Sequence, residues 1–222
     1  MKAVIFDMYE TLITEWGHLS YKRRDISRDL QVDLQDFTKI WHGLEHDRWV
    51  GKYSYEEVIK LIMERLGCTN PTAYDTVIRK RYETKAACFS FLHKDIIPVL
   101  DKLKENGYKI GLISNCFSEE VKVIRESILY PYFDVAILSY EVGLVKPDRR
   151  IYELCVERLK VAPEECLYIG DGGCDELPAA RSFGMNAYQA GWYLKEFKDN
   201  YCIDGFECMD SPLQILEKLN NV

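Results

Sequence analysis

Strand and helix patterns alternate along the second half of the chain, and this alternation constrains the fold more than any other sequence feature. Short apolar runs predict buried strands at residues 109–113, 135–138, 166–169 and 186–189. Amphipathic patterns predict helices at residues 94–105, 119–129, 148–160 and 175–183. Because neighbouring parallel strands need a crossover connection, we expect an α/β fold with a doubly wound, Rossmann-like parallel sheet. A further apolar run, residues 3–6, supplies another strand.

The segment between the first strand and this alternating region has only helical patterns. Residues 36–49 and 72–85 each predict a helix, and Ser54 with Glu57 forms a capping-box pattern that opens another. We therefore predict a Rossmann-like core made of residues 1–14 and 90–222, with an all-helical cap inserted at residues 15–89. Ser211 followed by Pro212 predicts the start of a C-terminal helix.

Composition excludes several classes of function. The 222 residues carry a formal net charge of −7 without any basic stripe, which argues against nucleic acid or an anionic membrane as a partner. No apolar run approaches the roughly 20 residues of a membrane span, and we expect no signal peptide. No two of the eight cysteines have Cys-x-x-Cys spacing, so neither a zinc site nor a redox motif is indicated. We expect reduced thiols in a cytoplasmic protein.

Polar side chains follow four of the predicted elements at the edge where ligands bind in open parallel sheets. They are Asp7 with Thr11, Ser114 with Asn115, Lys146, and Asp171 with Asp175 and Glu176. A cluster of carboxylates repels itself unless a cation is present, and Mg²⁺ binds one or two carboxylates while keeping positions for water and phosphate. Lys146 adds a positive charge, and Ser114 a donor for anionic oxygens.

In order and residue type, these four segments resemble the motifs of the haloacid dehalogenase (HAD) superfamily. Asp7 to Thr11 matches the first motif, Ser114 the second, Lys146-Pro147 the third, and the segment from Gly170-Asp171 onward the fourth. The resemblance covers essentially the whole chain, and residues 15–89 resemble the family's helical cap.

This resemblance implies a phosphatase that uses Mg²⁺ and attacks a small phosphorylated metabolite with Asp7, forming an aspartyl-phosphate. The Asp7 carboxylate, the backbone carbonyl of Tyr9 and Asp171 would hold the metal. Asp175 or Glu176 would hold a metal-bound water or orient Lys146. Thr11 and Ser114 would bond the phosphoryl oxygens, and Asn115 would either fix the second-motif loop or contact substrate.

One position departs from the phosphatase pattern. Most phosphatases of the family have a second Asp two residues after the nucleophile, as a general acid and base, whereas this chain has Tyr9. Tyr at this position is typical of the family's 2-haloacid dehalogenases, which leaves metal-free dehalogenation open as an alternative. The acidic fourth motif favours the Mg²⁺-dependent phosphatase, because in a metal-free site the carboxylates of Asp171 and Asp7 would raise each other's pKa and weaken the nucleophile. A weakly active binding or regulatory protein is a third alternative.

Several residues of the cap are weaker candidates. Arg48 could reach a substrate anion when the cap closes, but a surface salt bridge is the favoured interpretation. Trp16 and His18 could line the entrance, although a lone His in such a segment is more often a solvated loop residue. A basic face could attract an anionic substrate, but it is more simply a solvated surface. It consists of Lys22, Arg23, Arg24 and Arg28.

Overall fold

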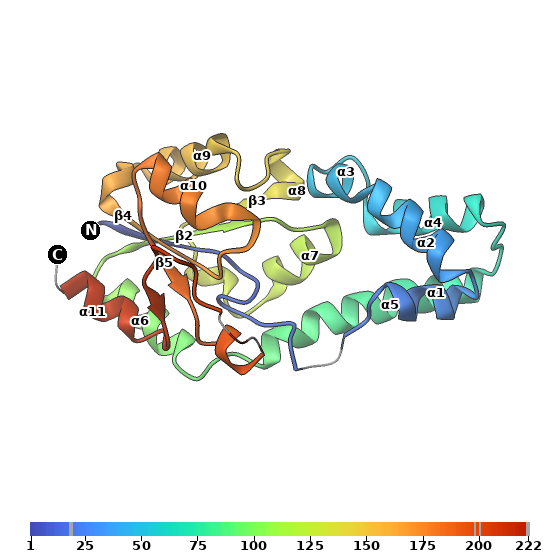
Figure 1. The fold of residues 1–222 in the computed structure, drawn as a ribbon, viewed down its shortest axis with the longest axis horizontal. Coiled ribbons are helices and arrows are strands. Elements are labelled where there is room, and N and C mark those ends of the chain that lie inside the picture. The colour runs from blue at the N-terminus through green and yellow to red at the C-terminus, as the bar shows by residue number, and fades with distance from the viewer. Residues whose placement is uncertain (18–19, 198, 200, 221–222) are drawn as a thin grey trace.

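A six-stranded parallel sheet forms the centre of one lobe in the computed structural model, which describes residues 1–17, 20–197, 199 and 201–220. His18 lies outside these residues. The strands are β1 (Ala3–Phe6), β2 (Lys109–Ser114), β3 (Val135–Leu138), β4 (Cys166–Gly170), β5 (Asn186–Ala190) and β6 (Cys208–Met209). Their order is β3-β2-β1-β4-β5-β6, so β1 lies inside the sheet between β2 and β4 (Figure 1). The predicted α/β class and parallel sheet are confirmed.

Alternating side chains of β1 pack on the two faces of the sheet, as expected of a strand buried on both sides. Val4 and Phe6 belong to a core shared with α6 (Ile96–Glu105), α7 (Ser118–Glu126) and α11 (Gln214–Asn220). Ala3 and Ile5 belong to a second core shared with α9 (Arg149–Leu159) and α10 (Glu176–Phe183). The sheet is therefore covered by helices on both faces, and the residue after β1 emerges at its carboxyl edge.

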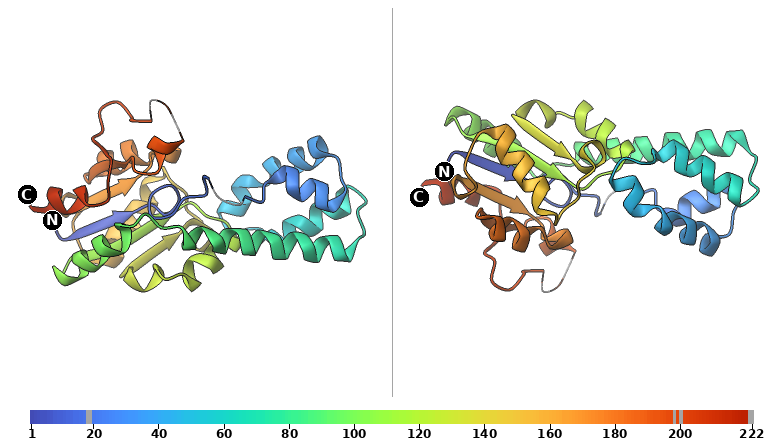
Figure 2. Two further views of the ribbon diagram at one scale, coloured as in Figure 1. Left: turned by 90° about the horizontal axis from the view of Figure 1, so that it is seen from below. Right: turned by 90° about the horizontal axis from the view of Figure 1, so that it is seen from above.

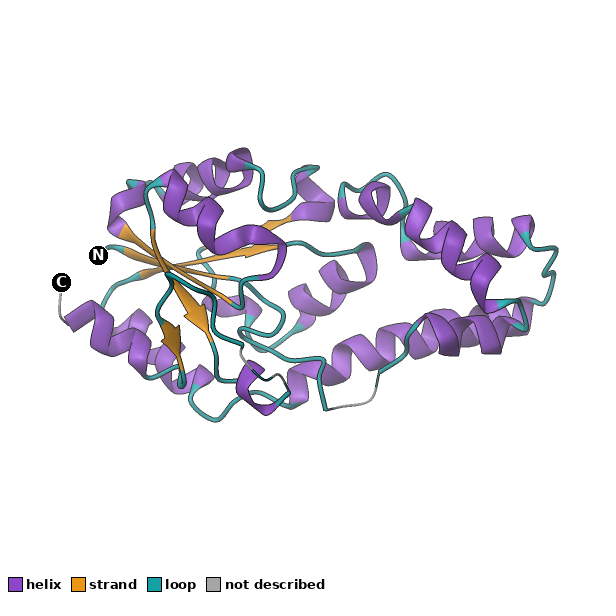
Figure 3. Ribbon diagram, in the orientation of Figure 1, coloured by secondary structure: helices purple, strands orange, loops and turns teal. Residues whose placement is uncertain are grey.

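The helices before α6 form a lobe of their own. They are α1 (Arg23–Leu30), α2 (Leu34–Gly43), α3 (Glu45–Trp49), α4 (Tyr55–Arg65) and α5 (Pro71–Ala87), called here the cap helices. They share a separate hydrophobic cluster, and they extend away from the sheet in every view (Figures 1 and 2). No strand lies among the described residues of this lobe (Figure 3). The exact domain boundaries, near residues 14 and 89, stay predictions.

Local sequence explains most helix ends. Ser54 Oγ accepts from the Glu57 backbone N–H, and Glu57 returns a bond to the Ser54 N–H, so the predicted capping box is present. The predicted helix over residues 36–49 is instead divided between α2 and α3 at Leu44. The C-terminal α-helix begins at Gln214 and not at Ser211, because the backbone N–H groups of Gln214, Ile215 and Leu216 each donate to the carbonyl three residues earlier, so residues 211–213 form tighter turns.

The remaining elements are short. They are α8 (Ser139–Val142) and the 3₁₀ helices Cys88–Ser90, Tyr130–Tyr132, Pro163–Glu165, Gly173–Asp175 and Leu194–Glu196. Strand β6 was not predicted because only two of its residues pair with β5. Among the described residues, none of the helices has the length and apolar content that crossing a membrane requires.

Candidate active site

Asp7 and Lys146 form a buried ion pair at the carboxyl edge of the sheet. Asp7 directly follows β1, and its Oδ1 lies 2.5 Å from the Nζ of Lys146. Asn115, next to the end of β2, holds the Lys146 backbone from both sides: its Oδ1 accepts from the Lys146 N–H at 2.7 Å, and its Nδ2 donates to the Lys146 carbonyl at 3.1 Å. Asn115 thus ties the second-motif loop to the third-motif loop, so its side-chain atoms serve to position Lys146.

Three carboxylates surround this lysine. Asp7, Asp171 and Glu176 each offer an oxygen within 4.8 Å of the others. Burial, together with the charges of Glu176 and Asp171, raises the pKa of Asp7 to about 8 in spite of Lys146. The carboxylates of Asp7 and Glu176 raise the pKa of Lys146 although burial opposes its charge. One ammonium group cannot neutralise three carboxylates, and hard oxygen donors at this spacing suit Mg²⁺.

Asp175 and Glu176, which the sequence did not distinguish, have different surroundings. Glu176 is fully buried; its Oε2 accepts from the Tyr168 hydroxyl at 2.7 Å and from Lys146, and its Oε1 accepts from the Gly172 N–H at 3.0 Å. A Cβ at Gly170 would lie only 2.0 Å from this carboxylate, so the approach requires glycine there. Asp175 is exposed at the start of α10 and does not join the carboxylate group. Glu176 is therefore the residue that orients Lys146.

Two buried hydroxyl groups belong to the first and second motifs. Thr11 Oγ1 lies 3.4 Å from Asp7 Oδ2. Ser114 Oγ at the end of β2 is buried and has no hydrogen-bond partner among the described residues. A buried hydroxyl without a partner is costly and uncommon, and it is accounted for where a ligand supplies the missing bond.

Tyr9 occupies the position of the missing acid and base. Its hydroxyl is also buried without a partner in the described part of the chain. Burial, together with the charges of Glu120 and Glu15, holds its pKa well above its ordinary value, so the phenol is protonated at neutral pH. The neighbouring Glu10 does not replace it, because its carboxylate accepts from the Thr14 hydroxyl and from the Glu15 N–H.

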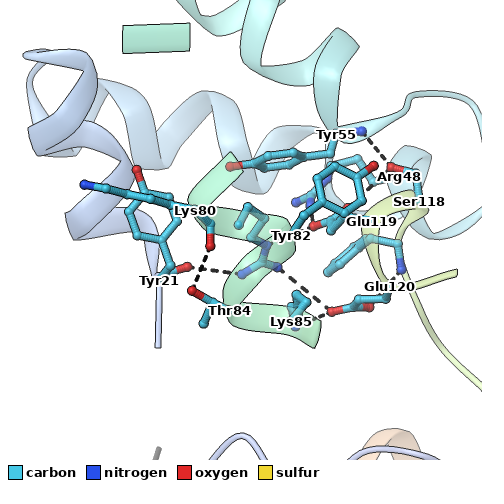
Figure 4. Close-up of polar contacts among 12 residues, drawn as sticks. Tyr21, Arg48, Tyr55, Lys80, Tyr82, Thr84, Lys85, Ser118, Glu119 and Glu120 are labelled. Carbon is cyan, nitrogen blue, oxygen red and sulfur yellow. Dashed lines mark hydrogen bonds and ion pairs between the residues drawn. The ribbon is translucent and has the colours of Figure 1, made fainter. Parts of the chain in front are cut away.

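Arg48 is not the surface salt bridge favoured from the sequence. Its side chain is 1% exposed, its Nη2 lies 3.2 Å from Glu119 Oε1 on α7, and its guanidinium lies 3.9 Å from the ring centroids of both Trp41 and Phe117. Figure 4 shows Arg48 beside Glu119, with Glu120 and Lys85 close by. The prediction failed because the partner of Arg48 lies 71 positions later in the sequence.

Arg48 belongs to a larger group of buried and half-buried charges, called here the cap–core ion cluster. Its members are Arg48, Arg81 and Lys85 of the cap helices with Glu15, Glu119 and Glu120. Arg81 Nε lies 3.1 Å from Glu119 Oε1, and Lys85 pairs with both Glu15 and Glu120. Lys85 Nζ also lies 4.9 Å from the Tyr9 ring centroid, so the cluster reaches the first motif.

Part of the predicted basic face lines a cavity of about 640 Å³ beside the cap helices. Lys22, Arg23 and Arg24 contribute to its wall together with Arg81 and the rings of Trp41 and Phe117. Arg28 is not among the lining residues and pairs with Asp25 and Asp29. The Asp7, Asp171 and Glu176 carboxylates do not line this cavity.

Comparison with known proteins accounts for the arrangement of the four loops. The family described as haloacid dehalogenase-like hydrolase matches residues 1–184. The chain belongs to this hydrolase family. Among curated relatives of this HAD-like hydrolase is the glyceraldehyde 3-phosphate phosphatase of Methanopyrus kandleri, 28% identical over 195 residues that cover 83% of this chain and 82% of the relative. Another is the pyrophosphatase PpaX of Bacillus mycoides, which is 26% identical over 200 residues that cover 81% of this chain and 87% of the relative.

Solved structures share the fold of this HAD-like hydrolase. A HAD phosphatase from Thermococcus onnurineus has a TM-score of 0.67 at 22% identity and covers 99% of this chain and 98% of its own. A 2-haloacid dehalogenase from Pseudomonas syringae has a TM-score of 0.75 at 19% identity, and the match covers 100% of this chain and 99% of the dehalogenase. A HAD family enzyme from Bacteroides thetaiotaomicron, solved with magnesium and inorganic phosphate, has a TM-score of 0.63 at 22% identity, with 90% and 97% covered.

Proposed function

We propose that this hydrolase is a Mg²⁺-dependent phosphatase that hydrolyses a small phosphomonoester in the cytoplasm. One observation carries the proposal: Asp7 and Glu176 both pair with Lys146, and Asp171 joins them in one group of three carboxylates at the edge of the sheet where β2 ends in the buried, unpartnered Ser114 hydroxyl. The phosphatase names of the curated relatives support the same reaction class. The fold alone does not separate phosphatase from dehalogenase, since structures of both kinds resemble it.

The residues present fit a magnesium ion. Asp7 and Asp171 would hold it together with the backbone carbonyl of Tyr9. Glu176 is a poorer ligand because both of its oxygens already accept hydrogen bonds from the protein, and Asp175 is exposed and outside the group. When bound, the metal would supply the positive charge that lets an anionic nucleophile approach an anionic phosphate.

The remaining groups divide the work of phosphoryl transfer. Asp7 would attack phosphorus and form an aspartyl-phosphate as the alcohol departs. Lys146, held by Asn115 and Glu176, would keep Asp7 in place and offset phosphoryl charge, and Ser114 and Thr11 would donate to phosphoryl oxygens. Tyr9 stays protonated and cannot accept a proton from the attacking water, so we expect slow hydrolysis of the aspartyl-phosphate.

Metal-free dehalogenation of a 2-haloacid is the second candidate, favoured by Tyr9 alone. It leaves unexplained why Asp171 and Glu176 lie beside the nucleophile, where they raise its pKa. An aryl phosphate assay with and without EDTA, run beside halide release from 2-chloropropionate, separates the two. We expect phosphate release that EDTA abolishes and no halide. Halide release without metal would refute the phosphatase, and a lack of both products would favour a binding role.

The assignment of metal ligands predicts opposite results for two neighbouring aspartates. Asp171→Ala should raise the Mg²⁺ concentration for half-maximal activity by at least about tenfold, since it removes a ligand. Asp175→Asn removes the same charge from an exposed position outside the carboxylate group, tolerates the left-handed backbone there and should leave the titration unchanged. Equal responses of the two variants in a Mg²⁺ titration would contradict the assignment.

A further inference from the structure

The segment between β5 and β6 brings two thiols together beside the fourth-motif loop. Cys202 and Cys208 interact through their side chains. A Cβ at Gly191 would lie 2.7 Å from Cys208 Sγ and 3.0 Å from the ring of Tyr201, so the residue before Cys202 also lies next to Cys208. Cys202 is exposed and Cys208 is half-buried, with its Sγ close to Gly191. Their spacing in sequence resembles no redox motif, and folding of the segment is what makes them neighbours.

Gln189 accounts for this folding. Its backbone N–H donates to the Glu207 carbonyl at 2.9 Å, in the ladder that pairs Gln189 with Cys208. Its side chain donates to the Tyr201 carbonyl at 2.9 Å and accepts from the Ile203 N–H at 2.8 Å. One buried residue therefore fixes the backbone on both sides of Cys202 and also the backbone at Cys208.

The same Gln189 reaches the fourth motif. Its Nε2 donates to the backbone carbonyl of Asp171 at 2.9 Å. Ile203 packs against Gly172, whose φ of +98° and close contact both require glycine: a Cβ there would lie 2.1 Å from Ile203 Cδ1. The thiol-bearing segment and the Asp171 loop thus share one hydrogen-bonding residue and one packing contact.

We propose that Cys202 and Cys208 are a disulfide-forming pair, oxidised by peroxide, whose bond fastens the 201–208 segment against the Asp171 loop. A disulfide tolerates little deviation in geometry, and Gln189 holds the backbone beside both thiols, which keeps them neighbours. Cys155 and Cys166 also lie near one another, but both are fully buried, out of reach of a soluble oxidant.

The chemistry follows from the different exposures of the two sulfurs. The exposed Cys202 thiolate attacks peroxide and becomes a sulfenic acid, while the peroxide oxygen that leaves takes up a proton as water. The Cys208 sulfur then attacks the Cys202 sulfur, and the sulfenic hydroxyl departs as a second water with the Cys208 proton. Two thiols lose two electrons and one peroxide becomes two waters. Burial raises the pKa of Cys208 to about 12, so Cys202 and not Cys208 takes the first step.

Peroxide treatment of the full chain followed by mass spectrometry of non-reduced peptides tests the pair. We expect a loss of two hydrogens on a peptide that spans both cysteines, reversed by dithiothreitol. Cys202→Ser and Cys208→Ser should each prevent it, and Cys68→Ser, a change at a half-buried thiol of the cap lobe, should not. Sulfinic acid on Cys202, a link between two chains, or two thiols that still alkylate fully would each overturn the proposal.

Hydrogen exchange tests the connection to the fourth motif. Oxidation of the wild-type chain should slow amide exchange in residues 171–173 by about tenfold, because opening of the fastened segment becomes rarer. The same treatment should not change exchange there in Cys202→Ser. Unchanged exchange in an oxidised wild-type chain would show that the bond does not act on this loop. Neither measurement depends on phosphatase activity.

Discussion

Replacing Asp7 by asparagine should lower phosphatase turnover by at least about 10³-fold, because the amide cannot attack phosphorus to form the acyl phosphate. The fold should survive this change. Asp7 lies in one group with Glu176 and Asp171, and its raised pKa means that its ionised form costs folding free energy at neutral pH. We therefore expect the thermal midpoint of metal-free Asp7→Asn to equal or exceed that of the wild type.

Two measurements separate this result from general damage. Rapid acid quenching with a labelled substrate should trap phosphate on the wild-type protein and none on Asp7→Asn. Asp148→Asn is a matched control, because Asp148 is a partly exposed N-cap residue of α9 that pairs with Arg150. Near-normal turnover by Asp7→Asn would rule out covalent catalysis on this residue.

Replacing Glu119 by alanine should destabilise the protein by about 3–5 kcal/mol, the usual cost of leaving a buried charge without its partner. Glu119 is fully buried and pairs with Arg48 and Arg81. Two of the three guanidinium nitrogens of Arg48, Nε and Nη1, already lack partners among the described residues. Removing Glu119 would leave the remaining nitrogen without an ion pair as well.

Urea unfolding followed by circular dichroism measures this loss. Glu83→Ala is the matched control: Glu83 pairs with Arg79 on the exposed side of α5, where such pairs contribute only about 0.3–0.5 kcal/mol. Equal losses of unfolding free energy in the two variants would show that the cap–core ion cluster stabilises the protein no more than an exposed ion pair does.

The difference in unfolding free energy between the wild type and Glu119→Ala should depend on pH. Burial opposes ionisation of Glu119, but Arg81 and Arg48 outweigh it and hold its pKa below the ordinary value. A lowered folded-state pKa gives stability that is present above the ordinary glutamate pKa and is lost as pH falls through the folded value. The difference between wild type and Glu119→Ala should therefore shrink in acid. A difference that stays constant or grows would contradict this role.

Local patterns were sufficient to predict the sheet and the motif loops. The five longer strands are buried runs of four to six residues with clear ends, so their carboxyl edges could be located from the sequence. Asp7, Ser114 and Asp171 each follow or end such a strand, whereas Lys146 lies in the loop after β3 and α8. The structure brings Asp7, Lys146 and Asp171 to one edge. The two-residue β6 has no periodicity to detect.

Features that depend on distant partners could not be predicted. Arg48 sits on a helix that is charged at several positions, and nothing near it in sequence shows that Glu119 will bury it. The choice between Asp175 and Glu176 depends on the positive φ of Cys174 and Asp175, which turns Glu176 inward and leaves its neighbour in solvent. Neither residue lies in a sequence pattern that predicts this backbone conformation.

The position of β1 within the sheet has a consequence for biosynthesis. Ala3 pairs with Lys109 on one side and with Cys166 on the other, so the strand that carries the nucleophile has no sheet partner until those residues have left the ribosome. The cap helices, by contrast, have a hydrophobic cluster made from residues 21–77. Loop-closure entropy delays pairing between distant strands, whereas nearby helices pack early. The strand of the first motif therefore stays unpaired until β2 has been made, and the active site is complete only when the loop after β4 follows.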